Sequence, residues 1–303
     1  MDLYESKLQN SNSRNQDKNL NTSELIVKCL ENEGVKYIFG IPGEENLTFL
    51  NALKDSKIKF ITTRHEQGAA FMADVYGRLT GTPGVCLSTL GPGATNLMTG
   101  VADANMDGAP LVALTGQAGT DRMHLVSHQH LDLISMFAPI TKWNKQVVRP
   151  DTAPEIIRRA FKTAVCEKPG AVHIDLPENI AAMPALGRPL SHGDTERSYA
   201  TYSSIERAAA VISIAKNPVI LAGNGVIRSK ASETLTAMVT KLRIPVANTF
   251  MAKGVVSYKN PLSLWSIGLA QRDYVNRLFE KVDLVIAVGY DIRSEEHTSE
   301  LQS

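Results

Sequence analysis

The sequence predicts an α/β protein, in which a doubly wound parallel-sheet domain precedes a second, incomplete α/β unit. Between Thr22 and Pro177, short β-branched runs alternate with amphipathic stretches, as is typical of parallel strands joined by helices. The alternation starts again near residue 203, after a stretch rich in Pro, Gly, Ser and charged residues. At 303 residues, the chain has about two domains' length at roughly 100 to 200 residues each.

In the first unit, residues 22–177, strands are expected where β-branched runs end at turn signals, and helices fill the intervals. The expected strands are Tyr37–Phe39, Lys59–Thr62, Gly84–Ser88, Leu111–Leu114 and Val172–Asp175. The expected helices are Ser23–Asn32, Asn46–Lys54, Glu66–Leu79, Ala94–Asn105 and Ala153–Cys166.

Residues 178–202 are expected to be a linker, and residues 203–292 an incomplete second unit with the same alternation. Its expected helices are Ile205–Ala215, Ala231–Leu242 and Arg272–Glu280, and its expected strands are Val219–Leu221, Pro245–Ala247 and Leu284–Val288.

The two ends of the chain are expected to lie outside the folded units. Residues 1–21 contain five asparagines and no apolar core of a signal peptide, so we expect a disordered tail. Residues 293–303, RSEEHTSELQS, interrupt the α/β pattern. Their reverse translation resembles a common sequencing-library adapter, so we interpret them as an artefact and the chain as a fragment.

Composition limits the class of partner. Lysine plus arginine (32) nearly equals aspartate plus glutamate (31), so the net charge of +1 favours neither nucleic acid nor an anionic membrane. The three cysteines, Cys29, Cys86 and Cys166, have neither disulfide-framework nor zinc-site spacing, which favours the cytoplasm. We therefore expect a cytoplasmic protein with a small-molecule partner and no metal ligands of its own.

Three loops carry the polar and glycine-rich signals. They are Gly40–Asn46, Arg64–Ala70 and Gly91–Asn96, and each follows an expected strand. In open α/β sheets, ligands bind at the carboxyl ends of the strands, so these loops are expected to meet at one edge.

Each signal, taken alone, has a structural alternative. The turn Gly91–Gly93 permits close approach of a ligand, but taken alone it favours a rigid strand-to-helix turn. Glu66 stands at a helix start, where a helix-capping role competes with that of a buried acid that shares a proton with a ligand nitrogen. The pair Gly223 and Gly225 resembles half a dinucleotide fingerprint without its third glycine.

Together, the motifs resemble the aminopyrimidine-binding (Pyr) domain of thiamine-diphosphate enzymes, and within them the acetolactate synthase large-subunit family. The resemblance covers about residues 22–292, and the second unit is similar to the family's Rossmann-like central domain. The motifs that carry it are FGIPG (39–43), RHEQGAA (64–70), GPGATN (91–96), TGQ (115–117), TKW (141–143) and VHIDLP (172–177).

The resemblance implies a carboligase that uses thiamine diphosphate to decarboxylate pyruvate and condense it with a second 2-keto acid. Glu66 matches the glutamate that hydrogen-bonds the cofactor's aminopyrimidine ring and promotes formation of its ylid. The other implied site residues are Pro42, Gly43, Gly93 and Asn96 at the cofactor, Gly43 near the reacting centre, and His128 and Gln129 in the substrate loop, with Gln129 catalytic. The product would serve branched-chain amino acid biosynthesis or the acetoin pathway.

Further implications concern partners and subtype. The family binds the diphosphate through Mg²⁺ held by a third domain that is missing here, and assembles as a homodimer or homotetramer, so we expect this chain alone to be inert. His128 and Asp291 stand where flavin-binding members carry phenylalanine and arginine, which makes FAD doubtful. A pyruvate oxidase, a 2-keto acid decarboxylase and a non-catalytic nucleotide-binding module are the alternatives.

Overall fold

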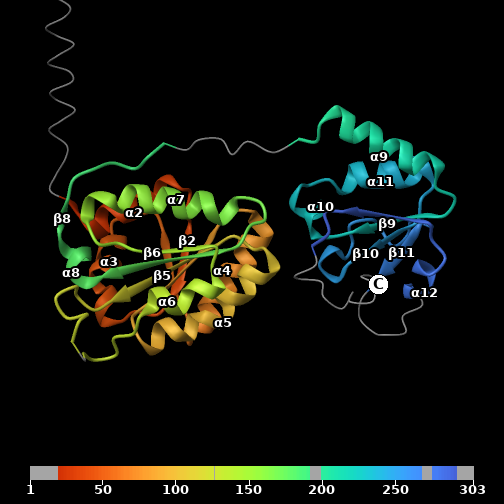
Figure 1. The fold of residues 1–303 in the computed structure, drawn as a ribbon. Helices are drawn as coiled ribbons and strands as arrows, with labels where there is room; N and C mark the ends of the chain where they lie inside the picture. Colours follow the sequence, from red (N-terminus) through yellow and green to blue (C-terminus); the bar gives the residue numbers. More distant parts are fainter. Residues whose placement is uncertain (1–19, 126, 192–198, 268–274, 292–303) are drawn as a thin grey trace, which may run out of the picture. The chain divides into compact units, whose positions relative to one another are not determined.

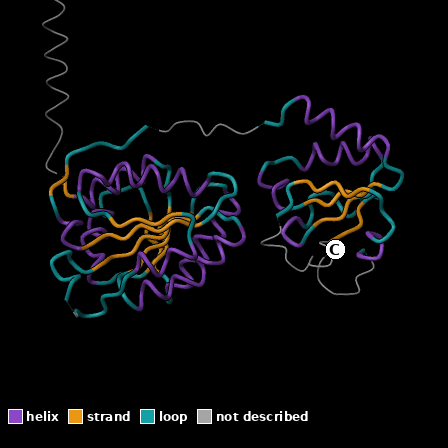
Figure 2. Tube along the Cα trace, viewed as in Figure 1, coloured by secondary structure: helices purple, strands orange, loops and turns teal. Residues whose placement is uncertain are grey.

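The computed structural model describes residues 20–125, 127–191, 199–267 and 275–291. The chain divides into two compact units between residues 195 and 196. Each unit has a central parallel sheet with helices against it, so the predicted α/β class is confirmed (Figure 2). Most of the expected N-terminal tail and the whole of residues 293–303 lie outside the described residues.

A six-stranded parallel sheet forms the centre of the first unit. Its strands, in spatial order, are β3 (Lys59–Thr62), β2 (Tyr37–Gly40), β4 (Gly84–Ser88), β5 (Leu111–Gln117), β7 (Ala171–Pro177) and β6 (Trp143–Gln146). The chain leaves β2 toward β3 on one side and returns to β4 on the other. The sheet therefore has a topological switch point between β2 and β4, where ligands of open α/β sheets bind.

Helices cover both faces of this sheet (Figure 1). One face carries α2 (Thr22–Asn32), α3 (Leu47–Leu53) and α7 (Ala153–Val165), and the other α4 (Glu66–Thr80), α5 (Pro92–Asp107) and α6 (Leu133–Phe137). In β4, Val85 and Leu87 belong to the first core and Cys86 to the second, as the alternation of strand side chains requires.

The two cores differ in side-chain size. Against α2, α3 and α7, the core is built from leucine, isoleucine, valine and phenylalanine side chains. Against α4 and α5 it contains many alanines, such as Ala70, Ala73 and Ala104, which allow the two helices to pack close to the sheet and to each other. Arg78 also joins these helices, with ion pairs to Asp74 of α4 at 2.9 Å and to Asp107 of α5 at 2.7 Å.

Both borders of the first unit are more structured than expected from the sequence. Leu20–Asn21 forms strand β1, which pairs antiparallel with β8 (Pro184–Ala185), and α8 (Glu178–Ala182) precedes β8. Asn21 also caps α2, because its side chain accepts from the Glu24 amide at 2.9 Å while its own amide donates to the Glu24 carboxylate. Residues 178–185, assigned to the linker from their composition, thus pack on the first unit.

The second unit contains a four-stranded parallel sheet in the order β11 (Ser263–Ser266), β10 (Val246–Asn248), β9 (Pro218–Ala222) and β12 (Leu284–Val288). Its helices are α9 (Tyr202–Ile214), α10 (Asn224–Arg228), α11 (Ser232–Leu242) and α12 (Asn276–Phe279). Part of the helix expected over Arg272–Glu280 falls outside the described residues. Within the described ranges, no helix is long and apolar enough to cross a membrane.

Beyond the borders of the first unit, the structure contains further elements that were not predicted, namely β6, α6, α10 and β11. Strand β6 reads WNKQ, with two of its four residues polar amides and one a lysine, so it lacks a β-branched run. It lies at the sheet edge, where pairing with β7 on one side supplies its backbone partners. Tertiary pairing, rather than local propensity, therefore makes this segment a strand.

Substitution by alanine at two glycines of α4, Gly77 and Gly68, is expected to change the stability in opposite directions. A Cβ on Gly77 would lie 2.2 Å from the carbonyl oxygen of Pro110, whereas a Cβ on Gly68 would meet nothing within 4 Å. We expect Gly77→Ala to lower the free energy of unfolding by about 1–3 kcal/mol through overpacking. Gly68→Ala should raise it by about 0.5–1 kcal/mol, since alanine favours the helix. Urea unfolding of both variants checks this; equal effects would contradict it.

Candidate functional site

Three glycine-rich and polar loops lie at the carboxyl edge of the six-stranded sheet, namely Gly40–Asn46, Arg64–Ala70 and Gly91–Asn96. The loop after β2 and the loop after β4 lie on the two sides of the switch point, and the loop after β3 leads directly into α4. Their juxtaposition is shown by contacts among residues 43, 66, 89, 93 and 96. The edge predicted from the sequence is thus where these residues meet.

Glu66 is a buried acid at the first position of α4, with 9% of its surface exposed. His65 provides the N-cap instead, because its Nδ1 accepts from the Gln67 amide at 3.1 Å. One oxygen of Glu66, Oε2, accepts a hydrogen bond from Asn96 Nδ2 at 3.0 Å. The other oxygen, Oε1, lies 3.4 Å from the place where Gly93 would carry a Cβ. The carboxyl group therefore faces space that the missing side chain of Gly93 leaves open.

Thr89 packs against both site glycines. A Cβ on Gly43 would lie 2.5 Å from the Thr89 Cβ, and a Cβ on Gly93 would lie 2.9 Å from the Thr89 Cγ2. The hydroxyl of Thr89 donates to Glu45 Oε2 at 2.6 Å, which fixes the side chain between the loops after β2 and β4. Both glycines are thus required by close packing, and neither has a positive φ.

Asn46 shapes the loop that carries Gly43. It is 2% exposed, accepts from the Gly43 amide at 2.9 Å and donates to the Ile41 carbonyl at 3.2 Å. Sequence reasoning missed Asn46, Thr89 and Glu45. For Asn46 a local signal existed, because a polar side chain three residues after a helix N-cap, here Gly43, can accept from the N-cap amide.

The remaining predicted residues lie at the surface of this edge. Pro42 is exposed, and so are His128 and Gln129 in the segment between β5 and α6. Gln129 has φ +55° and contacts the turn before Gly93: its carbonyl oxygen lies 2.7 Å from where Gly91 would carry a Cβ. The structure thus places Gln129 beside the glycine turn.

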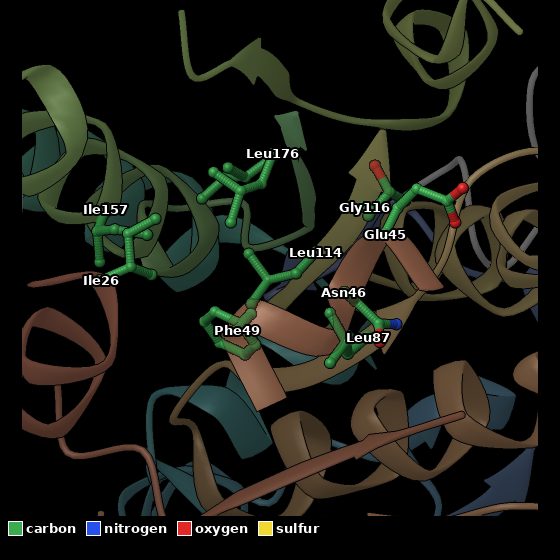
Figure 3. A pocket seen from close by; sticks show the side chains of 11 residues that line it. Ile26, Glu45, Asn46, Phe49, Leu87, Leu114, Gly116, Ile157 and Leu176 are labelled. Carbon is green, nitrogen blue, oxygen red and sulfur yellow. The ribbon is translucent and has the colours of Figure 1, made fainter. Parts of the chain in front are cut away.

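A small cavity lies beneath the Gly43 loop, on the face of the sheet covered by α2, α3 and α7 (Figure 3). Its volume is about 10 Å³, and most of its lining is apolar, including Phe49, Leu87 and Leu114. Such a volume holds at most one water molecule. The cavity is therefore a packing defect below the site. The candidate space for a ligand lies instead at the edge of the sheet next to Glu66 and Gly93.

A buried polar cluster lies in the sheet between β5 and β7. Thr115 Oγ1 donates to Asp175 Oδ1 at 2.7 Å, so it accepts from His173 Nε2, 2.9 Å away. The unprotonated Nδ1 of His173 then has no hydrogen-bond partner among the described residues, and the ring stacks on Phe137 with centroids 3.9 Å apart. Burial lowers the pKa of His173 from 6.5 to about 3 and raises that of Asp175 from 3.8 to about 6.

The pKa shifts of Asp175 and His173 change the free energy of unfolding with pH in opposite directions. Folded Asp175 retains its proton up to about pH 6, so its contribution to the free energy of unfolding falls as pH rises from about 4 to 6. Folded His173 stays neutral where the unfolded chain becomes protonated, so its contribution falls as pH drops below 6.5. Each slope is about 1.4 kcal/mol per pH unit, and the two nearly cancel between about pH 4 and 6.

Removing either His173 or Asp175 should reveal how the remaining group makes the free energy of unfolding depend on pH. Relative to the unsubstituted chain, His173→Gln should give an unfolding free energy that falls with rising pH between about 4 and 6. Asp175→Asn should give one that rises over the same window. Urea unfolding at half-unit pH steps measures both slopes, and slopes of the same sign in the two variants would contradict the assignment.

In the second unit, Gly223 and Gly225 are explained by close backbone packing. The Gly225 amide donates to the Gly289 carbonyl at 2.8 Å, and a Cβ on Gly223 would lie 2.4 Å from the same oxygen. The Gly225 amide is therefore engaged within the fold. This arrangement favours the structural alternative for the glycine pair over a nucleotide-binding turn.

Comparison with known proteins adds the following. Residues 20–136 match the family "Thiamine pyrophosphate enzyme, N-terminal TPP binding domain", and residues 205–302 match "Thiamine pyrophosphate enzyme, central domain". The chain is 43% identical over 274 residues to the "Probable acetolactate synthase large subunit" of Methanocaldococcus jannaschii, covering 88% of this chain and 46% of that protein.

Two bacterial relatives show the same coverage. The acetolactate synthase isozyme 1 large subunit of Escherichia coli is 36% identical, and the acetolactate synthase of Bacillus subtilis is 37% identical. The matches cover 88% and 89% of this chain and 48% of each relative. The chain thus spans about half the length of the curated relatives it matches.

Proposed function

The chain belongs to the thiamine pyrophosphate enzyme family, and we propose that it carries the aminopyrimidine-binding part of an acetolactate synthase-like carboligase. The observation that carries this proposal is the buried carboxyl group of Glu66, held by Asn96 and facing the bare α-carbon of Gly93. A carboxyl group so placed can exchange a proton with a heterocyclic nitrogen in that space.

The residues present fit the aminopyrimidine ring of thiamine diphosphate. Glu66 supplies an acid–base group beside the bare α-carbon of Gly93, and Thr89, which packs against Gly43 and Gly93, bounds that place on one side. Bound thiamine diphosphate supplies the electron sink for decarboxylation of a 2-keto acid and its addition to a second one. Glu66 binds the ring and moves a proton at its nitrogen, while Asn96 fixes the orientation of the carboxyl group.

Pyruvate is the proposed 2-keto acid and acetolactate the proposed product. The exposed side chains of His128 and Gln129, beside the Gly91 turn, support a role in contacting the substrate. Pro42 is proposed to line the cofactor space next to Gly43. No flavin is part of this proposal, because Asp291 stands where flavin-binding members carry an arginine.

Mg²⁺ is proposed as the cation that binds the cofactor's diphosphate. Among the residues that the structure describes, no group of three or more His, Cys, Asp or Glu side chains could hold a metal ion. None of these residues is therefore assigned to the metal, and the proposal leaves the cation to other parts of the assembled enzyme.

A homodimer or homotetramer in the cytoplasm is the proposed assembly. Along α4, Met72, Val75 and Leu79 are exposed at 44%, 49% and 81%, and they share the helix that begins at Glu66. Exposed apolar side chains along one helix support a second subunit as their cover. Sedimentation of the full-length protein should show a dimer or tetramer, and a monomer at micromolar concentration would contradict this part of the proposal.

Product analysis of the full-length protein tests the proposed function. With thiamine diphosphate, Mg²⁺ and pyruvate, we expect release of carbon dioxide and accumulation of acetolactate, detected as acetoin after acid treatment. Acetaldehyde as the main product would instead indicate a decarboxylase, and oxygen-dependent formation of acetate or acetyl phosphate would indicate an oxidase. Absence of thiamine diphosphate binding would refute the proposal altogether.

A further inference from the structure

Gln117 connects the interior of the sheet to the segment that contains Gln129. It is the last residue of β5 and is 1% exposed. Its Nε2 donates to the Leu131 carbonyl oxygen at 3.1 Å, and its Oε1 lies 3.2 Å from His130 Nδ1. Its Nε2 also lies 3.5 Å from Asp175 Oδ2. These contacts, named here the Gln117 bridge, join a core carboxylate to the two residues after Gln129.

Asp175 orients the amide group of Gln117. Asp175 is fully buried and accepts from Thr115 on Oδ1 at 2.7 Å, and from Gln146 on Oδ2 at 2.7 Å. With Gln117 as a third donor, both carboxylate oxygens face N–H or O–H groups only. The Nε2 of Gln117 must therefore point toward Asp175 and Leu131, which leaves its Oε1 toward His130.

Gln129 is held in a conformation that it would not adopt by itself. Its φ of +55° is in the left-handed region, which non-glycine residues disfavour. Its carbonyl oxygen and Cβ lie 2.7 Å and 2.8 Å from the position where Gly91 would carry a Cβ. A strained residue of this kind persists only where neighbouring contacts over-determine it. The two residues that follow it are held by the Gln117 bridge, and the His130 amide also donates to the Ser127 carbonyl oxygen at 3.4 Å.

We infer that Gln117 and Asp175 are positioning residues, which hold residues 129–131 against the Gly91 turn and so keep Gln129 at the edge where the 2-keto acid binds. Neither residue touches the substrate. The part that concerns Gln129 and the substrate rests on the proposed function, whereas the ordering of residues 127–133 by the bridge does not.

Hydrogen exchange of the 303-residue chain tests the bridge. Gln117→Met retains the length of the side chain but removes every hydrogen bond it makes. We expect the amides of residues 127–133 to exchange about ten-fold faster, as the loss of two hydrogen bonds implies. Ser23→Ala is the matched control, because it removes a buried hydrogen bond to the Ala181 carbonyl oxygen on the other face of the same sheet.

The two variants separate positioning from general destabilisation. Exchange in residues 127–133 that accelerates in Gln117→Met but changes less than two-fold in Ser23→Ala supports the inference. Equal acceleration in both, or none in Gln117→Met, overturns it. If Gln117→Met does not fold, Gln117→Leu serves instead, because it also removes both side-chain contacts to His130 and Leu131 and should release the same segment.

Kinetics of the full-length enzyme tests the link to the substrate. Gln117→Met should raise the KM for pyruvate about ten-fold or more while the KM for thiamine diphosphate changes less than two-fold. An equal rise in both constants, or an unchanged KM for pyruvate, overturns the positioning role. Failure of the proposed function is distinguishable, because the unsubstituted enzyme would then form no acetolactate while the exchange difference persisted.

Discussion

Glu66→Gln is expected to slow acetolactate formation by the full-length enzyme about 10²- to 10⁴-fold, the usual contribution of a positioned acid–base group. Glutamine retains the size of the side chain and an oxygen that can accept from Asn96, so the local packing should persist. It lacks the ability to exchange a proton with the cofactor ring. The measurement is the initial rate of acetolactate formation at saturating pyruvate and thiamine diphosphate.

Glu155→Gln is the matched control for this experiment. Glu155 also lies in the first turn of a helix, α7, but it is exposed, and α7 packs on the opposite face of the sheet. We expect its activity to stay within two-fold of the unsubstituted enzyme. A Glu66→Gln enzyme with activity within ten-fold of the unsubstituted one would exclude Glu66 as the acid–base group.

The second large effect is expected from Gly93→Ala. The new Cβ would lie 2.9 Å from Thr89 Cγ2 and 3.4 Å from Glu66 Oε1, so it strains the packing and fills the ligand space at once. We expect a loss of about 1–3 kcal/mol in the free energy of unfolding and at least a ten-fold weaker binding of thiamine diphosphate. Thermal unfolding and a cofactor titration measure the two effects separately.

Thr89→Ser provides the decisive second substitution. It removes Cγ2, the atom that Gly93→Ala would meet, but retains the Cβ that a Cβ on Gly43 would approach within 2.5 Å. The double variant with Gly93→Ala should therefore regain stability but not cofactor binding, whereas Gly43→Ala should stay destabilised with Thr89→Ser, because its Cβ would still lie 2.5 Å from the Cβ and 2.9 Å from the Oγ1 of residue 89. Recovery of cofactor binding in the Gly93→Ala double variant would show that the ligand does not occupy the space beside Glu66.

Much of the first unit was predictable because its strands and helices are marked locally. The strands Lys59–Thr62 and Gly84–Ser88 have the predicted limits, and α4 begins at Glu66 as expected. Runs of β-branched residues and turn glycines act within a few residues of the chain, so one sequence suffices to place them. The edge strand β6 was missed because it has a polar sequence and depends on its pairing with β7.

The candidate site was predictable in part for the same reason. The glycine turns and Glu66 carry recognisable motifs, and the structure brings Glu66, Asn96 and Gly93 together. The partners that fix them were not predictable: Thr89 and Glu45 are 44 residues apart in the chain and are joined by a hydrogen bond. No local pattern reports a contact across that separation.

From sequence alone came the α/β class, the edge of the sheet where the motif loops meet, and the membership of the thiamine pyrophosphate enzyme family. The first two follow from short-range hydrophobic patterns and from the order of strands and helices, and the third from the resemblance of the motifs. Tertiary structure alone decided that Thr89 fills the space between two glycines, and that Gln117 joins Asp175 to the segment carrying Gln129. Both depend on side chains from distant segments that meet only after the sheet has formed, because close packing and buried hydrogen bonds are properties of the assembled core.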